Sequence, residues 1–188
     1  MVTERQVLLI KLVEKLHLHE SWCGETHIQK ATYILQELAD VNTDFSFILY
    51  KYGPYSFDLN VELGHMLRKE YLQLLPRAGY GPVFEKGPNS WFLEQHSVDE
   101  PTMRAIEFVA SSLGGKSVKE LEPLATALMV TVESERGEVT DRLSALIEKK
   151  PHLSSNLELA QWALTEVDRM KARFHGGMLP LRLVERSL

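Results

Sequence analysis

The pattern of hydrophobic and polar positions changes period twice within the first half of the chain. Residues 3–17 and 26–39 carry apolar side chains at helical spacing, which predicts two amphipathic helices. Thr3 followed by Gln6 forms a capping-box pattern, which places the start of the first helix. Residues 45–50 alternate instead, with Phe45, Phe47 and Leu49 on one face, which predicts a strand.

Gly53-Pro54 ends this strand, because proline cannot donate to a β-ladder and glycine tolerates unusual dihedral angles. We expect Gly53 to adopt a conformation that a Cβ would penalise. From Ser56 the period becomes helical again, and Ser56 is the predicted N-cap, with Asp58 in the first turn. The stretch therefore predicts strand, tight turn and helix in succession.

The next segment predicts a small β-wing. Residues 72–75 form a short apolar run, residues 77–88 are rich in glycine and proline, and residues 90–94 are predicted to return as a strand. Helix, helix, strand, helix, strand, loop, strand is the element order of a winged helix.

The second half of the chain predicts helices. The polar segment 96–101 marks a boundary, and the predicted helices span residues 102–113, 117–133, 139–149 and 155–174. Pro123 implies that the second of these either starts there or kinks. The segment from Gly114 to Ser117 predicts a helix C-cap followed by an N-cap. The tail, residues 178–188, is apolar and basic and is predicted to pack back or meet a partner.

The predicted fold class is therefore mainly α with a small antiparallel β-wing. A winged-helix-like N-terminal half, residues 1–98, is followed by a helical half, residues 99–188, that packs on it or mediates association, including a possible homodimer.

Two motifs carry a resemblance to a known family. The helix-like HIQKATYILQEL precedes the turn KYGPYSFDL. This arrangement resembles small prokaryotic proteins of YwgA type and is more distantly similar to the Panacea antitoxin domain. Residues 27–30 of this chain stand where the resemblance leads us to expect "KLQK". The resemblance covers roughly residues 6–93 and implies a winged-helix-like fold.

The net charge of the chain argues against strong nonspecific binding to nucleic acid. The 188 residues have a formal net charge of −5, and neither half of the chain is basic. A local basic patch remains compatible with DNA binding. No run is long enough for a membrane span, the N-terminus does not read as a signal peptide, and the single Cys23 fits a reducing cytoplasm.

Catalytic and metal-binding motifs do not emerge from the sequence. His17, His19, Cys23 and His27 lie close together, but their spacing matches no usual zinc pattern, so we expect surface residues at a helix end. There is no P-loop, GxGxxG or GxSxG. We therefore predict a protein that is not an enzyme and that holds no metal or cofactor.

Aromatic residues gather around the Gly-Pro turn, where residues 45–57 hold six of the chain's aromatic side chains. An exposed aromatic and basic surface binds proteins or stacks on single strands. Alternatively, most of these rings lock the strand and turn onto the first two helices, and Tyr55 is expected to be the most exposed. The candidate partner-binding residues are Tyr50, Tyr52, Gly53, Pro54 and Tyr55.

The helix after the turn is a candidate recognition helix. Its predicted exposed side chains and those of the wing give the possible nucleic-acid-binding set Asn60, His65, Arg68, Lys69, Arg77 and Lys86. Asp58 and Glu62 occupy the end that usually contacts bases and would repel phosphates, which favours a protein partner slightly. The predicted function is a non-catalytic interaction protein, antitoxin-like or regulatory, in a prokaryotic defence or stress locus. The alternative is a DNA-binding transcription regulator.

Overall fold

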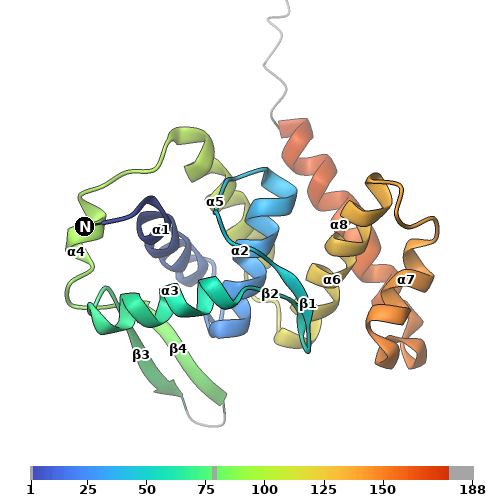
Figure 1. The fold of residues 1–188 in the computed structure, drawn as a ribbon, viewed down its shortest axis with the longest axis horizontal. Coiled ribbons are helices and arrows are strands. Elements are labelled where there is room, and N and C mark those ends of the chain that lie inside the picture. Colours follow the sequence, from blue (N-terminus) through green and yellow to red (C-terminus); the bar gives the residue numbers. More distant parts are fainter. Residues whose placement is uncertain (1, 78–79, 178–188) are drawn as a thin grey trace, which may run out of the picture.

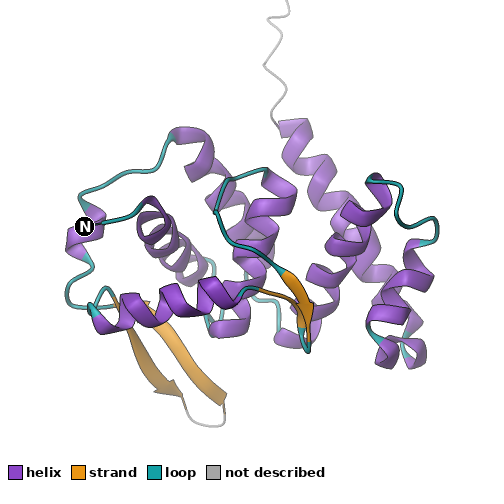
Figure 2. Cartoon of the chain, in the orientation of Figure 1, coloured by secondary structure: helices purple, strands orange, loops and turns teal. Residues whose placement is uncertain are grey.

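The chain folds into a mainly helical structure with two small antiparallel hairpins, which confirms the predicted fold class (Figures 1 and 2). The computed structural model describes residues 2–77 and 80–177. The tail 178–188, with its predicted role, lies outside the described residues. In order, the elements are α1 (Glu4–Leu18), α2 (Glu25–Ala39), β1 (Ile48–Tyr50), β2 (Gly53–Tyr55), α3 (Phe57–Arg68), β3 (Leu72–Arg77), β4 (Tyr80–Lys86), α4 (Trp91–Glu94), α5 (Glu100–Leu113), α6 (Val118–Glu135), α7 (Arg142–Lys149), the 3-10 helix η1 (Pro151–Ser155) and α8 (Leu157–Gly177).

The helix starts follow the capping signals in the sequence. Thr3 and Gln6 form the predicted capping box of α1, and Ser56 caps α3 by accepting the backbone N–H of Leu59 at 3.2 Å. Gly114 is the C-cap of α5, and Ser117 is the N-cap of α6. Because α6 begins at Val118 and continues through Pro123, the alternative that a helix starts at Pro123 is wrong.

The strand predicted over residues 45–50 is shorter in the structure. β1 covers only Ile48–Tyr50, because its single partner β2 ends at Tyr55, which pairs with Ile48. Among the described residues no strand pairs with residues 45–47, and Phe45 is instead buried, with the Arg5 guanidinium 5.0 Å from its ring centroid.

The wing consists of β3 and β4, which pair in antiparallel register from Leu72↔Lys86 onward. The strand predicted over residues 90–94 is wrong, because this segment forms the short helix α4. The Ser90 carbonyl oxygen accepts the N–H groups of Leu93 and Glu94 at 2.8 and 3.1 Å, so the backbone groups are satisfied locally. Leu93 is buried, whereas Trp91 and Phe92 are exposed and stacked on each other with ring centroids 3.7 Å apart.

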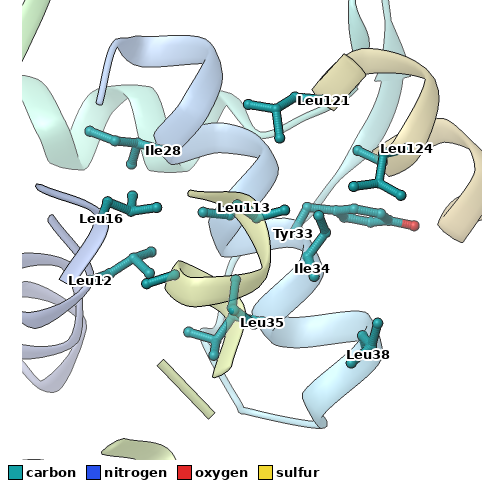
Figure 3. Packing of buried hydrophobic residues seen from close by; sticks show 14 of the residues in the cluster. Leu12, Leu16, Ile28, Tyr33, Ile34, Leu35, Leu38, Leu113, Leu121 and Leu124 are labelled. Carbon is teal, nitrogen blue, oxygen red and sulfur yellow. The ribbon is translucent and has the colours of Figure 1, made fainter. Parts of the chain in front are cut away.

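One hydrophobic core crosses the boundary near Val98. Figure 3 shows leucines of α1 and the apolar side chains of α2 meeting Leu113 of α5 and Leu121 and Leu124 of α6. Leu12 and Leu16 of α1, and Leu113, Leu121 and Leu124, are each at most 1% exposed. Helices α5 and α6 therefore pack directly on α2, which is the helix that supports the hairpin described below.

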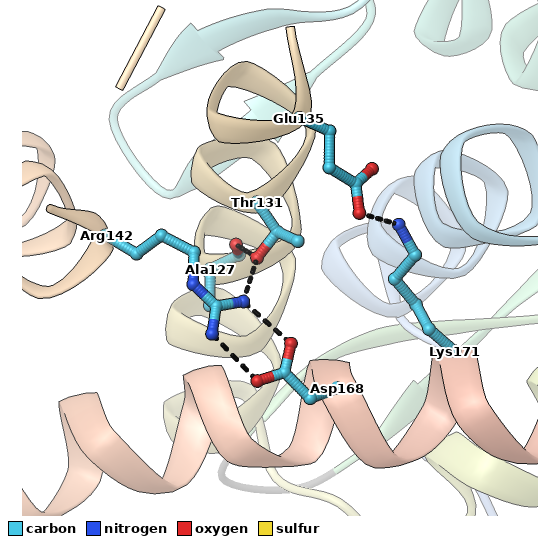
Figure 4. A network of polar contacts seen from close by, with 6 residues as sticks. All are labelled: Ala127, Thr131, Glu135, Arg142, Asp168 and Lys171. Carbon is cyan, nitrogen blue, oxygen red and sulfur yellow. Dashed lines mark hydrogen bonds and ion pairs between the residues drawn. The ribbon is translucent and has the colours of Figure 1, made fainter. Parts of the chain in front are cut away.

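A polar network joins the last three helices (Figure 4). Arg142 of α7 makes a bidentate pair with Asp168 of α8 at 2.7 and 2.8 Å, and also donates to Thr131 of α6 at 3.2 Å. The Lys171 ammonium pairs with Glu135 between α8 and α6. None of the helices in residues 2–77 and 80–177 combines the length and the apolar character that crossing a membrane requires.

Candidate functional site

The β1–β2 hairpin and the start of α3 expose a contiguous group of apolar side chains. Tyr50 and Phe57 are each 53% exposed and Ile48 is 50% exposed. The rings of Tyr50, Tyr55 and Phe57 contact one another pairwise, with centroids 5.1 to 5.6 Å apart. Ile48 lies directly opposite Tyr55 in the strand pair. We call Ile48, Tyr50, Tyr55 and Phe57 the aromatic surface.

Tyr55 is the least exposed of the three tyrosines in the hairpin, so the expectation that it would be the most exposed is wrong. Its side chain is half-buried, whereas Tyr50 and Tyr52 are exposed by 53% and 51%. The Tyr55 hydroxyl donates to the Glu25 carboxylate at 3.0 Å, and burial followed by this bond raises the pKa of Tyr55 to about 12. Tyr52 instead points into solvent, with the Lys51 ammonium 5.3 Å from its ring centroid.

Gln29 of α2 fixes the end of the hairpin by a bidentate amide contact. Its Nε2 donates to the Ser56 carbonyl oxygen at 2.9 Å, and its Oε1 accepts the Ser56 N–H at 2.9 Å. Both residues are fully buried, so no water competes for these bonds. The Gln29 amide thus bonds to the backbone of Ser56 as a neighbouring strand would, at the point where the hairpin ends and α3 begins.

Lys30, the next residue of α2, holds the turn itself. Its side chain is 1% exposed, and its Nζ donates to the Pro54 carbonyl oxygen at 2.9 Å. The pKa of Lys30 is lowered to about 8, mainly by burial and also by the nearby Lys150, against the opposing effect of the Glu122 and Glu25 carboxylates. A cation is retained in the interior because it satisfies a buried carbonyl group.

Lys150, which follows α7, contacts the same hairpin from the C-terminal half of the chain. Its Nζ donates to the Lys51 carbonyl oxygen at 3.2 Å, across a sequence separation of 99 residues. Burial lowers the pKa of Lys150, and burial also raises the pKa of Glu122, whose carboxylate lies near both lysines. The helical C-terminal half thus contributes directly to the position of the turn.

Gly53 and Pro54 are buried and position the tyrosines rather than forming part of the exposed surface. Gly53 has φ +90°, which confirms the expected conformation. A Cβ at this residue would also lie 2.7 Å from Thr126 Oγ1 and 3.4 Å from the Glu122 carbonyl oxygen of α6. Only glycine fits between the turn and α6.

Sequence reasoning missed the three polar anchors Gln29, Lys30 and Lys150, since polar residues are expected outside the core. For the first two a signal existed: they are the last two residues of the segment that stands where "KLQK" is expected. Lys150 carried no comparable signal, because its contact with the hairpin depends on the packing of α6 and α7.

The predicted nucleic-acid-binding residues fall into two groups. Asn60, His65, Arg68 and Lys69 are exposed on or just after α3, as predicted. In the wing, the Arg77 guanidinium lies 5.4 Å from a ring centroid of Trp22, and Lys86 pairs with Glu94 at 3.1 Å and Glu14 at 3.9 Å. The positive charge of Lys86 is therefore balanced by neighbouring carboxylates.

The His17, His19, Cys23 and His27 group is partly internal, so the expectation of surface residues is wrong for two of its members. Cys23 is fully buried and His27 is 2% exposed. Burial raises the pKa of Cys23 to about 12 and lowers the pKa of His27. His19 lies 2.6 Å from the Glu107 carboxylate, and within the described ranges no three His, Cys, Asp or Glu side chains are grouped to hold a metal ion.

No protein-family model matches the chain, and no curated protein matches it either.

Proposed function

We propose that the protein is a non-catalytic, winged-helix-like interaction protein that binds a protein partner through the aromatic surface. The observation that carries this proposal is the exposed ring cluster of Tyr50, Tyr55 and Phe57. Exposed aromatic side chains are the residues that dominate protein–protein interfaces.

The support beneath the surface strengthens the proposal. The hairpin carrying Tyr50 and Tyr55 is held by buried bonds from Gln29, Lys30 and Lys150. A surface that is already ordered loses little conformational entropy on binding, which favours affinity. An isolated hairpin with strands of three residues would have only marginal stability in water. The bonds from Gln29, Lys30 and Lys150 therefore keep the rings of the aromatic surface in place.

The resemblance to YwgA-type proteins and the Panacea antitoxin domain suggests the biological setting. The residues that carry it, the Gln29-Lys30 pair and the turn around Gly53-Pro54, are the ones that build the hairpin support. We propose on this basis an antitoxin-like or regulatory component of a prokaryotic defence or stress locus, acting in the cytoplasm.

The test compares partner capture by the wild-type protein with capture by two alanine variants, expressed in the native host and quantified by mass spectrometry. Tyr50→Ala removes a central ring of the aromatic surface. Trp91→Ala is the matched control, because Trp91 is also an exposed aromatic, at 49%, but belongs to α4. We expect a partner retained by wild type and Trp91→Ala and depleted roughly tenfold or more by Tyr50→Ala.

Two outcomes oppose the proposal. A wild-type protein that retains no partner under several growth conditions removes its basis. A partner retained equally by Tyr50→Ala and Trp91→Ala places the interface elsewhere.

A DNA-binding transcription regulator is the second candidate, because α3 precedes a β-wing and ends with exposed Arg68 and Lys69. Fluorescence anisotropy with DNA from its own promoter at two salt concentrations tests it. Binding should weaken at higher salt, and the salt slope should fall by about one for Lys69→Ala. Absence of binding at low salt excludes this candidate.

A further inference from the structure

A second exposed feature runs along α3, on the side opposite its buried face. Leu59, Leu63 and Met66 face the core. Phe57, Val61, Gly64 and Arg68 follow one another at helical spacing along the outer side, with Phe57 and Val61 exposed by 53% and 56%. This outer stripe is apolar over most of its length, in a helix whose position in the fold would otherwise suit DNA.

Gly64 lies in the interior of α3 without an internal reason for being glycine. A Cβ built there meets only the flexible end of the Arg68 side chain, at 3.6 Å from Nη1. Glycine in a helix interior is destabilising relative to alanine. A glycine on an exposed apolar stripe permits the backbone of another molecule to approach closely.

Charges on α3 are separated along the helix. Asp58 is exposed in its first turn, and Arg68 and Lys69 are exposed at its C-terminal end. Glu62 does not add to the exposed charge, because it accepts a bond from Gln6 at 2.7 Å and lies 3.9 Å from His65 of its own chain. Against an identical helix in antiparallel orientation, the acidic first turn faces the basic end at both ends of the contact. The helix dipoles are also opposed favourably in this orientation.

We propose that a second copy of this chain docks on the outer stripe of α3, antiparallel to the first, around a two-fold axis between Val61 and Gly64. In this register Val61 packs on Gly64 of the second copy, and Phe57 lies against its Arg68. Asp58 lies beside Arg68 and Lys69 of the second copy. The interface is isologous, so each favourable contact occurs twice. Phe57 belongs to both surfaces, so the second copy and the protein partner proposed for the aromatic surface would compete for this residue.

The decisive experiment uses charge reversal in the full-length chain, followed by sedimentation equilibrium. Asp58→Lys places like charges together twice in its homodimer, as does the double variant Arg68→Glu/Lys69→Glu. We expect the wild type to dimerise and each variant alone to lose affinity about tenfold or more. An equimolar mixture of the two variants restores both ion pairs, so it should form a heterodimer near wild-type affinity.

Gly64→Ala gives an independent readout that a folding defect does not mimic. We expect a higher melting temperature for the isolated chain, because alanine favours the helix, together with dimer affinity reduced about tenfold by the added methyl group. Circular dichroism of each variant verifies the fold.

Three results overturn the inference. The first is a wild-type chain that stays monomeric at concentrations up to about 1 mM. A dimer forms that is insensitive to the α3 variants, as expected if the helical C-terminal half associates instead. Finally, the charge-reversed mixture shows no recovery although both variants are folded.

Discussion

The Lys30 ammonium donates to the Pro54 carbonyl oxygen at 2.9 Å, and this bond joins the centre of α2 to the turn that carries the aromatic surface. Both residues are buried. It is one of several bonds by which Gln29 and Lys30 of α2, and Lys150 after α7, hold the β1–β2 hairpin.

The titration of Lys30 should make stability depend on pH. Its pKa is about 8 in the folded chain against 10.5 for a free lysine, so the unfolded chain binds more protons between these values. Stability from this group therefore rises as pH increases through 8. Between about pH 7.5 and 9 the gain is roughly 1 kcal/mol.

The measurement is the difference between wild type and Lys30→Met in urea unfolding at these two pH values. The comparison is needed because Cys23 and Tyr55 have raised pKa values of about 12 and act in the opposite direction as pH rises. An identical pH dependence in the two proteins would show that Lys30 binds its proton equally in the folded and the unfolded chain, so that burial does not lower its pKa.

Gly53→Ala should destabilise the fold by roughly 3 kcal/mol, from the positive φ and the close approach to Thr126 together. Gly137→Ala is the matched control. It also has positive φ, +79°, but a Cβ there meets nothing within 4 Å, so strain alone should cost roughly 1 kcal/mol. Thermal unfolding of both variants separates the two contributions. Equal losses would place the clash with Thr126 in doubt, whereas partial rescue of Gly53→Ala by Thr126→Ala supports it.

Gln29→Glu should destabilise the protein by roughly 2–3 kcal/mol at neutral pH, because a carboxylate oxygen replaces the Nε2 donor that faces the Ser56 carbonyl oxygen. Protonation restores a donor, so the folded chain should raise the pKa of this glutamate. The loss is then smaller at about pH 4.5 and grows as pH rises. Chemical denaturation of both proteins across this range measures it. A loss independent of pH would indicate that the amide is needed only for its shape.

Tyr50→Ala and Tyr55→Ala should separate binding from stability. Tyr50 is 53% exposed, so its removal should cost less than about 1 kcal/mol. Tyr55 is half-buried and bonded to Glu25, so its removal should cost roughly 2 kcal/mol. Differential scanning calorimetry checks the order, with Tyr55→Phe isolating the hydroxyl. A larger loss for Tyr50→Ala would make that ring a structural support rather than a binding residue.

Local signals in the sequence determined most of the secondary structure. The capping box at Thr3 and the N-cap at Ser56 depend on neighbouring residues alone, and the Gly-Pro turn indicates the positive φ of Gly53, so the sequence predicts all three. The fold class followed from the same periodicities.

Tertiary structure decided the rest. Trp91–Glu94 form a helix because β4, which lies within the segment 77–88 predicted as a loop, already pairs with β3 where the predicted strand would have paired. Gln29 and Lys30 are buried because the hairpin presents its carbonyl and N–H groups to α2. Lys150 reaches the Lys51 carbonyl oxygen across 99 residues of chain, and periodicity contains no information about a contact of that range. The partners that satisfy Gln29, Lys30 and Lys150 are distant in the sequence, so the positions of these buried polar groups are settled by the folded chain and not by their neighbours in sequence.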